Sequence, residues 1–234
     1  MIPLLLITSA LAGSLVGEVI RWDIQFAGVT GGQAWCEVLP GADGAVHIEA
    51  YARSADWYAR LYPIDDFVRS TWTPGDGSSR YETRFREGRF EQDQDMRISA
   101  DEIAVARRQK GDEGWREWDR TYPGAPGIED PVSAIYAMRS LSGDGPWIYP
   151  VFSGKETWPL QIEVVGQEHI EETPLGAVDV VVLSLRTLHT GDWEQKGRFL
   201  MYVTDDDRRI PVRFVVKTNF GAIRANIVAY TPPG

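Results

Sequence analysis

Apolar and polar residues alternate with a period of two through most of this chain, and this pattern restricts the fold more than any other feature. In residues 20–26 (IRWDIQF) the alternation is strict, which is typical of a strand with one buried and one wet face. Similar runs recur up to residue 120 and again from residue 147, separated by turns such as PGADG and TPGDGSS. Strands do not alternate with helices, so the pattern predicts an antiparallel meander and excludes a βαβ fold.

Roughly a dozen antiparallel strands with short turns must curl to bury one face. We therefore predict an all-β fold, mainly antiparallel, as a strongly curved sheet or open barrel with one helix packed on it or plugging it. Residues 111–131 (GDEGWREWDRTYPGAPGIEDP) are rich in glycine and proline and are interpreted as a long crossover connection that leads into the helix.

The predicted helix spans residues 130–140 (DPVSAIYAMRS). Asp130 is a favourable N-cap, a proline fits the first helical position, and Val132, Ile135 and Met138 recur every three residues. A curved sheet has a concave apolar face, and an amphipathic helix laid against it buries both surfaces. We expect these three residues and Tyr136 to be the contacts.

The first 12 residues (MIPLLLITSALA) resemble a signal peptide, because an apolar run ends in a small-x-small site before Gly13. No Lys or Arg precedes the run, which departs from the usual signal pattern. An apolar first strand is the alternative, but strands favour β-branched residues over leucine and alanine. We expect a signal peptide at 1–12, a single curved-sheet domain at 13–234, a periplasmic or otherwise exported protein, and no transmembrane span in the mature chain.

Charge argues against nucleic acid as a partner. The chain has 24 Lys and Arg against 34 Asp and Glu, a formal net charge of -10, and its basic runs have acidic neighbours. A phosphate-binding surface needs a concentrated basic patch.

Catalytic, cofactor and metal motifs are missing from the sequence. It contains no nucleophile elbow, zinc-protease motif or phosphate-binding loop. His47, His169 and His189 lie at spacings that match no metal site, and the lone Cys36 alternates with apolar residues as a buried thiol does. We predict a protein that is not an enzyme and has no cofactor or metal.

Three segments resemble a known family: LYPIDD at 61–66, DPVSAIYAMR at 130–139, and the hairpin VTDDDRRIPVRF followed by NFGAIRANI within 203–227. Together they are similar to the exported bacterial proteins of domain-of-unknown-function family 3108, over nearly the whole mature chain. The resemblance implies a mostly β protein that is exported by a Gram-negative bacterium and has no established activity. The architecture also looks like that of periplasmic lipoprotein-sorting proteins, in which a curved sheet and a helical lid hold acyl chains; this is an analogy of fold.

The candidate site lies on the polar side of the helix, where Ser133, Tyr136 and Arg139 are three residues apart. In a ligand site, Arg139 binds an anionic headgroup at the mouth of an apolar cavity lined by bulky residues such as Trp22 and Phe26. In a structural role, Arg139 pairs with a carboxylate of the sheet. Buried polar groups need partners with or without a ligand, which favours the structural role.

These patterns leave several functions open. The leading hypothesis is an exported cell-envelope protein that binds or carries a lipid-like hydrophobic ligand. The alternative is a structural or adaptor protein of the envelope that binds a protein partner through a strand edge or the helix face. An envelope hydrolase with a carboxylate site comes third. The hairpin turn at 205–208 is interpreted as an exposed turn, in which Asp206→Ala costs about 0.5 kcal/mol or less.

Overall fold

The computed structural model describes residues 15–143, 145–187, 199–218 and 221–234, so the predicted signal peptide lies outside the described residues. The strands within these ranges are β1 Val19–Phe26, β2 Val29–Pro40, β3 Val46–Ser54, β4 Asp65–Thr73, β5 Gly77–Glu87, β6 Phe90–Ile98, β7 Glu102–Gly111, β8 Gly114–Pro123, β9 Trp147–Phe152, β10 Thr157–Ile170, β11 Val178–Thr187, β12 Phe199–Thr204, β13 Pro211–Thr218 and β14 Gly221–Thr231. The helices are α2 Asp56–Ala59 and α3 Pro131–Met138.

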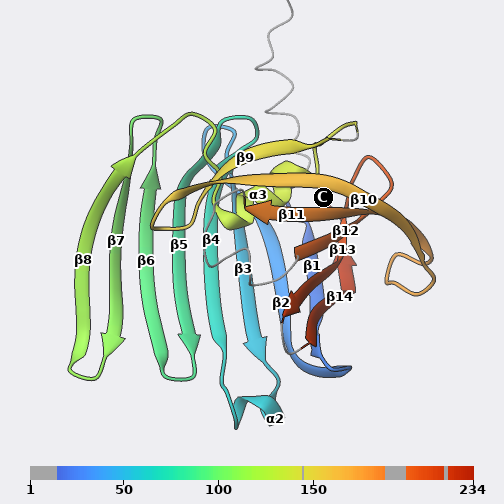
Figure 1. The fold of residues 1–234 in the computed structure, drawn as a ribbon, viewed down its shortest axis with the longest axis horizontal. Helices are drawn as coiled ribbons and strands as arrows, with labels where there is room; N and C mark the ends of the chain where they lie inside the picture. Colours follow the sequence, from blue (N-terminus) through green and yellow to red (C-terminus); the bar gives the residue numbers. More distant parts are fainter. Residues whose placement is uncertain (1–14, 144, 188–198, 219–220) are drawn as a thin grey trace, which may run out of the picture.

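All the strands belong to one antiparallel sheet of 14 strands, in the order β8-β7-β6-β5-β4-β3-β2-β1-β14-β13-β12-β11-β10-β9. Consecutive strands pair with one another, except β8 and β9. In addition, β1 pairs with β14 and so joins the two halves of the meander. Strands β8 and β9 are the two ends of the order, so the sheet is curved but not closed. The first half of the meander, β1–β8, forms a broad extended part of the sheet, which is called the wing here. In the view of Figure 1, β9 and β10 run across the region of α3. The predicted all-β fold class is confirmed.

Helix α3 packs inside the curve. Tyr136 and Ala137 contact a buried cluster with Val46, Ile48 and Trp72 from β3 and β4. A second cluster joins helix residues to the other half of the sheet: Ala134, Met138, Val181, Leu183, Met201 and Val203. The helix therefore ties the two halves of the meander together through apolar burial. Of the four contacts predicted from sequence, Tyr136 and Met138 are buried, whereas Val132 and Ile135 pack against the clusters half-buried.

The side of the wing that contacts α3 is called the inner face here, and the opposite side is the outer face. Cross-strand pairs such as Val46 with Trp72 and Val38 with Ile48 place these core residues on the inner face. Cys36 shares that face, in register with Ile20 and Ala50, as the alternation predicted.

The interpretation of residues 111–131 as a crossover connection is wrong in its first part, because residues 114–123 form the edge strand β8. Most of its side chains are exposed on both faces, so the strand has no apolar side to produce the usual alternation. The short helix α2 also has no signal in the sequence pattern. It contributes no buried residue, which explains the missing apolar stripe.

Candidate functional site

The start of α3 is fixed by a buried carboxylate. Asp130 Oδ1 accepts hydrogen bonds from the backbone amides of Val132 (2.7 Å) and Ser133 (2.9 Å), and the Ser133 hydroxyl accepts one from the Asp130 amide (2.9 Å). The other carboxylate oxygen accepts from the hydroxyls of Ser70 (2.5 Å) and Ser78 (2.7 Å), on β4 and β5. Asp130 therefore caps the helix and anchors it to the sheet at once.

The end of α3 is fixed by a buried ion pair. Arg139 donates from Nη1 to Glu18 Oε2 (2.5 Å) and from Nη2 to Glu18 Oε1 (2.8 Å). Its Nε donates to the Arg208 carbonyl (3.0 Å), and the Tyr230 hydroxyl donates to Glu18 (3.2 Å). The side chains of Arg139 and Glu18 are 7% and 0% exposed, so the pair lies beneath the surface of the protein.

Four of the five residues predicted for the ligand site are buried in the core, although not in one cluster: Trp22, Ser133, Tyr136 and Arg139. Ser133 and Arg139 have partners within the chain, and Trp22 donates from Nε1 to the Pro211 carbonyl (2.9 Å). In the described part of the chain the Tyr136 hydroxyl is buried without a hydrogen-bond partner. Phe26 differs: it is 48% exposed, because it is the last residue of β1 and extends past the core at the hairpin.

Sequence reasoning did not single out Glu129, the residue before the helix cap. Its Oε1 accepts a hydrogen bond from Trp72 Nε1 (3.3 Å), and its backbone forms a parallel bridge with Val151 of β9. Burial raises the pKa of this carboxyl to about 7, although hydrogen bonds from Ser133 and Trp72 oppose the shift. The adjacent acidic pair E129-D130 in an otherwise apolar context is the signal that could have drawn attention to it.

Helix α3 covers the inner face of the wing unevenly. Near the helix, Val38, Ile48, Ser70 and Trp72 are buried almost completely. Further along the same strands the inner face continues as a half-buried set of small or apolar residues, called the lower inner face here: Ala34, Ala50, Ala52, Val68 and Phe85.

At the far end of this face lie two acidic side chains, Asp66 and Glu87. Burial raises the pKa of both carboxyls. The charge of Asp66 and its hydrogen bond raise the pKa of Glu87 further, whereas the same hydrogen bond opposes the rise in the pKa of Asp66. An exposed carboxyl on a wet surface shows no such desolvation. Both side chains are half-buried, so this end of the lower inner face is only partly open to water.

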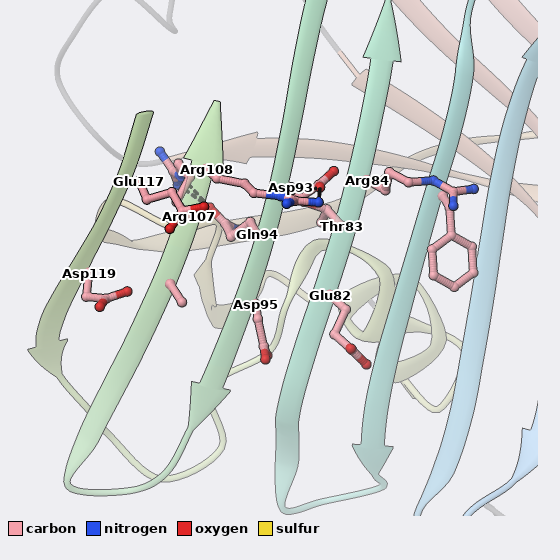
Figure 2. Close-up of a pocket in the computed structure, with 12 residues that line it drawn as sticks. Glu82, Thr83, Arg84, Asp93, Gln94, Asp95, Arg107, Arg108, Glu117 and Asp119 are labelled. Carbon is pink, nitrogen blue, oxygen red and sulfur yellow. Dashed lines mark hydrogen bonds and ion pairs between the residues drawn. The ribbon is translucent and has the colours of Figure 1, made fainter. Parts of the chain in front are cut away.

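A hollow with a volume of about 480 Å³ lies mainly on the outer face of the wing (Figure 2). Two cross-strand rows line it: Arg84, Asp93, Arg108 and Glu117, then Glu82, Asp95 and Asp119. Asp93 pairs with Arg86 and Arg108. The charged lining and these ion pairs describe a solvated polar face, which does not suit an acyl chain.

Within the described ranges, no group of three metal-binding side chains comes together. The same residues include no helix of the length and apolarity needed to cross a bilayer. His169 contacts the carboxylates of Asp179 (2.7 Å) and Glu171 (3.7 Å) at an exposed site, and those hydrogen bonds and charges raise its pKa.

The fold and the buried helix place the chain among open, strongly curved antiparallel sheets with an internal helix. Its sequence matches the family model described as "Protein of unknown function (DUF3108)" over residues 21–228, and the chain belongs to this family. No curated protein matches the chain.

Among solved structures, the fold is similar to a β-barrel-like protein of the family DUF1849 from Brucella abortus. The TM-score is 0.62 at 12% identity, and the match covers 94% of this chain and 99% of that one. The match to MucB has a TM-score of 0.35 at 11% identity and covers 98% of this chain and 57% of MucB. The first similarity supports a barrel-like fold, and neither transfers an activity.

Proposed function

We propose that this chain is an exported, non-enzymatic cell-envelope protein that binds a lipid-like hydrophobic molecule against the inner face of its sheet. The observation that carries the proposal is the lower inner face. It combines apolar side chains, small residues and incomplete burial on the concave side of the sheet. An acyl chain laid there removes apolar surface from water on both partners, at roughly 25 cal/mol per Å².

The polar side of α3 has a supporting role in this proposal. Arg139 is neutralised by Glu18 and Ser133 is part of the capping box, so neither is free to hold an anionic headgroup. Recognition then depends on apolar contact and shape. Such a site binds hydrophobic molecules of similar length with little selectivity for the headgroup.

A second candidate function is that of an adaptor, and the edge strand β8 favours it. The edge of β9 is bridged by the backbone of Glu129, whereas β8 is the last strand at the other end of the sheet. Glu117 and Asp119 of β8 lie on the outer face, and Arg116 and Arg120 lie on the inner face. A peptide strand with the opposite charge alternation would pair with this edge.

Recovery of the mature protein from a periplasmic fraction, followed by mass spectrometry for co-purified lipid, tests the leading function. Ala52→Trp fills the lower inner face and should lower the bound-lipid stoichiometry. Ala106→Trp places the same ring on the outer face and is the matched control. Absence of lipid from the parent protein would reject the carrier. N-terminal sequencing of the same sample tests export, with Gly13 expected as the first residue.

A further inference from the structure

One end of the wing carries most of the exposed apolar side chains. In an antiparallel meander, successive turns lie at opposite ends of the strands. The turns β1–β2, β5–β6 and β7–β8, and the β3–β4 connection through α2, share one end, at the lower edge of Figure 1. In the described ranges, eight of the eleven exposed large hydrophobic residues lie there: Phe26, Val29, Trp57, Leu61, Tyr62, Phe90, Trp115 and Ile223. We call these eight residues the aromatic rim.

The rim extends continuously across the end of the sheet. Phe26 is in register with Val29 on one side and Ile223 on the other. Trp57 Nε1 donates to the carbonyl of Thr30 (3.2 Å), which joins α2 to the β1–β2 turn.

The rim continues from α2 to the outer strands of the wing. Tyr62 lies so close to the β5–β6 turn that a Cβ on Gly88 would meet its ring at 2.7 Å. Arg86 and Arg108 lie over the ring of Trp115, at 5.6 and 4.9 Å from its centroid.

The opposite end of the wing has a different composition, so exposure of turns in general does not explain the rim. Its turns are residues 41–45 (GADGA), 74–76 (PGD) and 99–101 (SAD). None of them carries an exposed large hydrophobic residue. The three remaining exposed hydrophobic residues, Ile148, Val165 and Val228, lie within strands elsewhere.

We propose that the aromatic rim docks this protein on the surface of a lipid bilayer, with the strands of the wing standing away from the membrane. Trp and Tyr favour the water–hydrocarbon boundary, because each combines an apolar ring with a polar atom suited to the headgroup layer. Phe and Leu are common beside them on surfaces that insert into a bilayer. A protein partner usually finds its strongest contacts clustered at the centre of a patch. Here the exposed side chains belong to several turns and strand ends spread across one end of the sheet, which suits shallow insertion into a bilayer.

Charges around the rim are mixed. The basic side chains of Arg60, Arg89 and Lys110 are matched in number by acidic ones at the same end of the sheet: Asp56, Asp112 and Glu113. Attraction to anionic lipid requires a basic surplus. Docking should therefore depend on apolar insertion, so it should occur on zwitterionic vesicles and change little with salt.

The lower inner face ends close to this rim, since Ala52 and Phe85 are near the rim ends of β3 and β5. A hydrophobic molecule leaving the inner face there would meet the bilayer without crossing bulk water. Docking itself does not require a bound ligand, so the two proposals fail separately. Co-purified lipid measures the ligand site, and binding of the purified protein to vesicles measures the rim.

Co-sedimentation of the mature protein with phosphatidylcholine vesicles tests the rim. Leu61 is 77% exposed, and Leu61→Asp should weaken vesicle binding about tenfold or more, since it removes an inserting side chain and adds a charge. Trp57→Asp should act in the same direction. The matched controls are Ile148→Asp and Val165→Asp, which are 59% and 52% exposed in the parent and lie outside the rim.

The proposal predicts loss of binding for the two rim variants and parent-like binding for the two controls, with unchanged unfolding midpoints. It is overturned if the parent fails to bind vesicles, or if the controls lose as much as the rim variants. Binding that needs phosphatidylglycerol and disappears with salt would assign the contact to charge instead. Self-association that Leu61→Asp abolishes, without vesicle binding, would assign the rim to a second copy of this chain.

Discussion

Arg139, at the C-terminal end of α3, forms a bidentate ion pair with Glu18, 121 residues earlier in the chain, with N–O distances of 2.5 and 2.8 Å. Glu18 lies directly before β1, and α3 lies between the two halves of the meander. The pair therefore ties the internal helix to the strand at which the two halves join. The Tyr230 hydroxyl and the Arg208 carbonyl complete its hydrogen bonds.

We predict that Arg139→Ala lowers the free energy of unfolding by about 3–5 kcal/mol, because it leaves the buried Glu18 carboxyl without its ion-pair partner. The measurement is urea denaturation at neutral pH. Arg53→Ala is the matched control. Its ion pair with Asp65 has a similar N–O distance, 3.0 Å, but both side chains are about 60% exposed.

The control should lose about 1 kcal/mol or less. A double variant, Glu18→Ala with Arg139→Ala, should recover part of the loss, because no unpaired charge remains. Equal and small effects in Arg139→Ala and Arg53→Ala would contradict a buried structural pair.

Glu129 should make stability depend on pH in an unusual direction. Its pKa is raised by burial to about 7 in the folded protein, above the value of 4.5 for an unperturbed Glu. The folded state then binds the proton more tightly than the unfolded state. Its stabilising contribution is complete below about pH 4.5 and is lost as the pH rises through about 7, by on the order of 2–3 kcal/mol.

Glu129→Gln keeps an oxygen for the Trp72 hydrogen bond and removes the titration. The variant should be more stable than the parent at pH 8 and should lack the decline between pH 4.5 and 7 that Glu129 contributes. Denaturation midpoints across this range measure the difference. Parallel pH profiles for the two proteins would show that Glu129 titrates normally.

Helix α3 could be predicted from sequence because its signals are local. Asp130 caps the helix, and Met138 is buried on the apolar side of the helix, as the pattern indicated. The partner of Arg139 could not be predicted, since Glu18 is one of many acidic residues and is distant in the chain. Strand β8 was not predicted because most of its side chains are exposed on both faces, so its sequence has no alternation of apolar and polar residues. Phe26 continues the apolar alternation of β1 but lies beyond the core, and no local pattern records where a sheet ends.

The hairpin between β12 and β13 corrects a further expectation. Its turn is exposed as predicted, but Asp206 accepts hydrogen bonds from the Thr204 hydroxyl (2.6 Å) and from the amides of Arg208 and Arg209 (3.1 Å each). Burial alone would raise the pKa of Asp206, yet the hydrogen bonds from Thr204 and Arg208 outweigh it and lower the pKa.

Asp206→Ala should therefore cost about 1 kcal/mol at neutral pH rather than the 0.5 kcal/mol or less expected for a bare surface residue. The difference should shrink as the pH falls through the lowered pKa, because the parent loses the same carboxylate on protonation. Asp207→Ala, in the same exposed turn, is the control and should change the unfolding midpoint little. Thermal unfolding of the three proteins at neutral and acidic pH decides the matter.

Cys36 offers a direct test of how firmly α3 is held. Burial and the charge of Glu18 raise the pKa of its thiol to about 12, and Tyr136 of the helix is one of its electrostatic neighbours. A thiol with that pKa forms roughly a thousandfold less thiolate at pH 8.5 than a free cysteine does. The native protein should therefore react very slowly with a disulfide reagent.

Reaction should accelerate when the helix leaves the sheet, because Cys36 then gains water and its ordinary pKa. Arg139→Ala weakens the C-terminal anchor of α3 and should raise the labelling rate at least tenfold under native conditions, through more frequent local opening. Arg53→Ala should leave the rate unchanged. If both variants label as slowly as the parent while Arg139→Ala lowers global stability, the helix opens only when the whole sheet unfolds. In that case α3 is a fixed part of the core, and a lipid-like ligand must enter along the lower inner face without moving it.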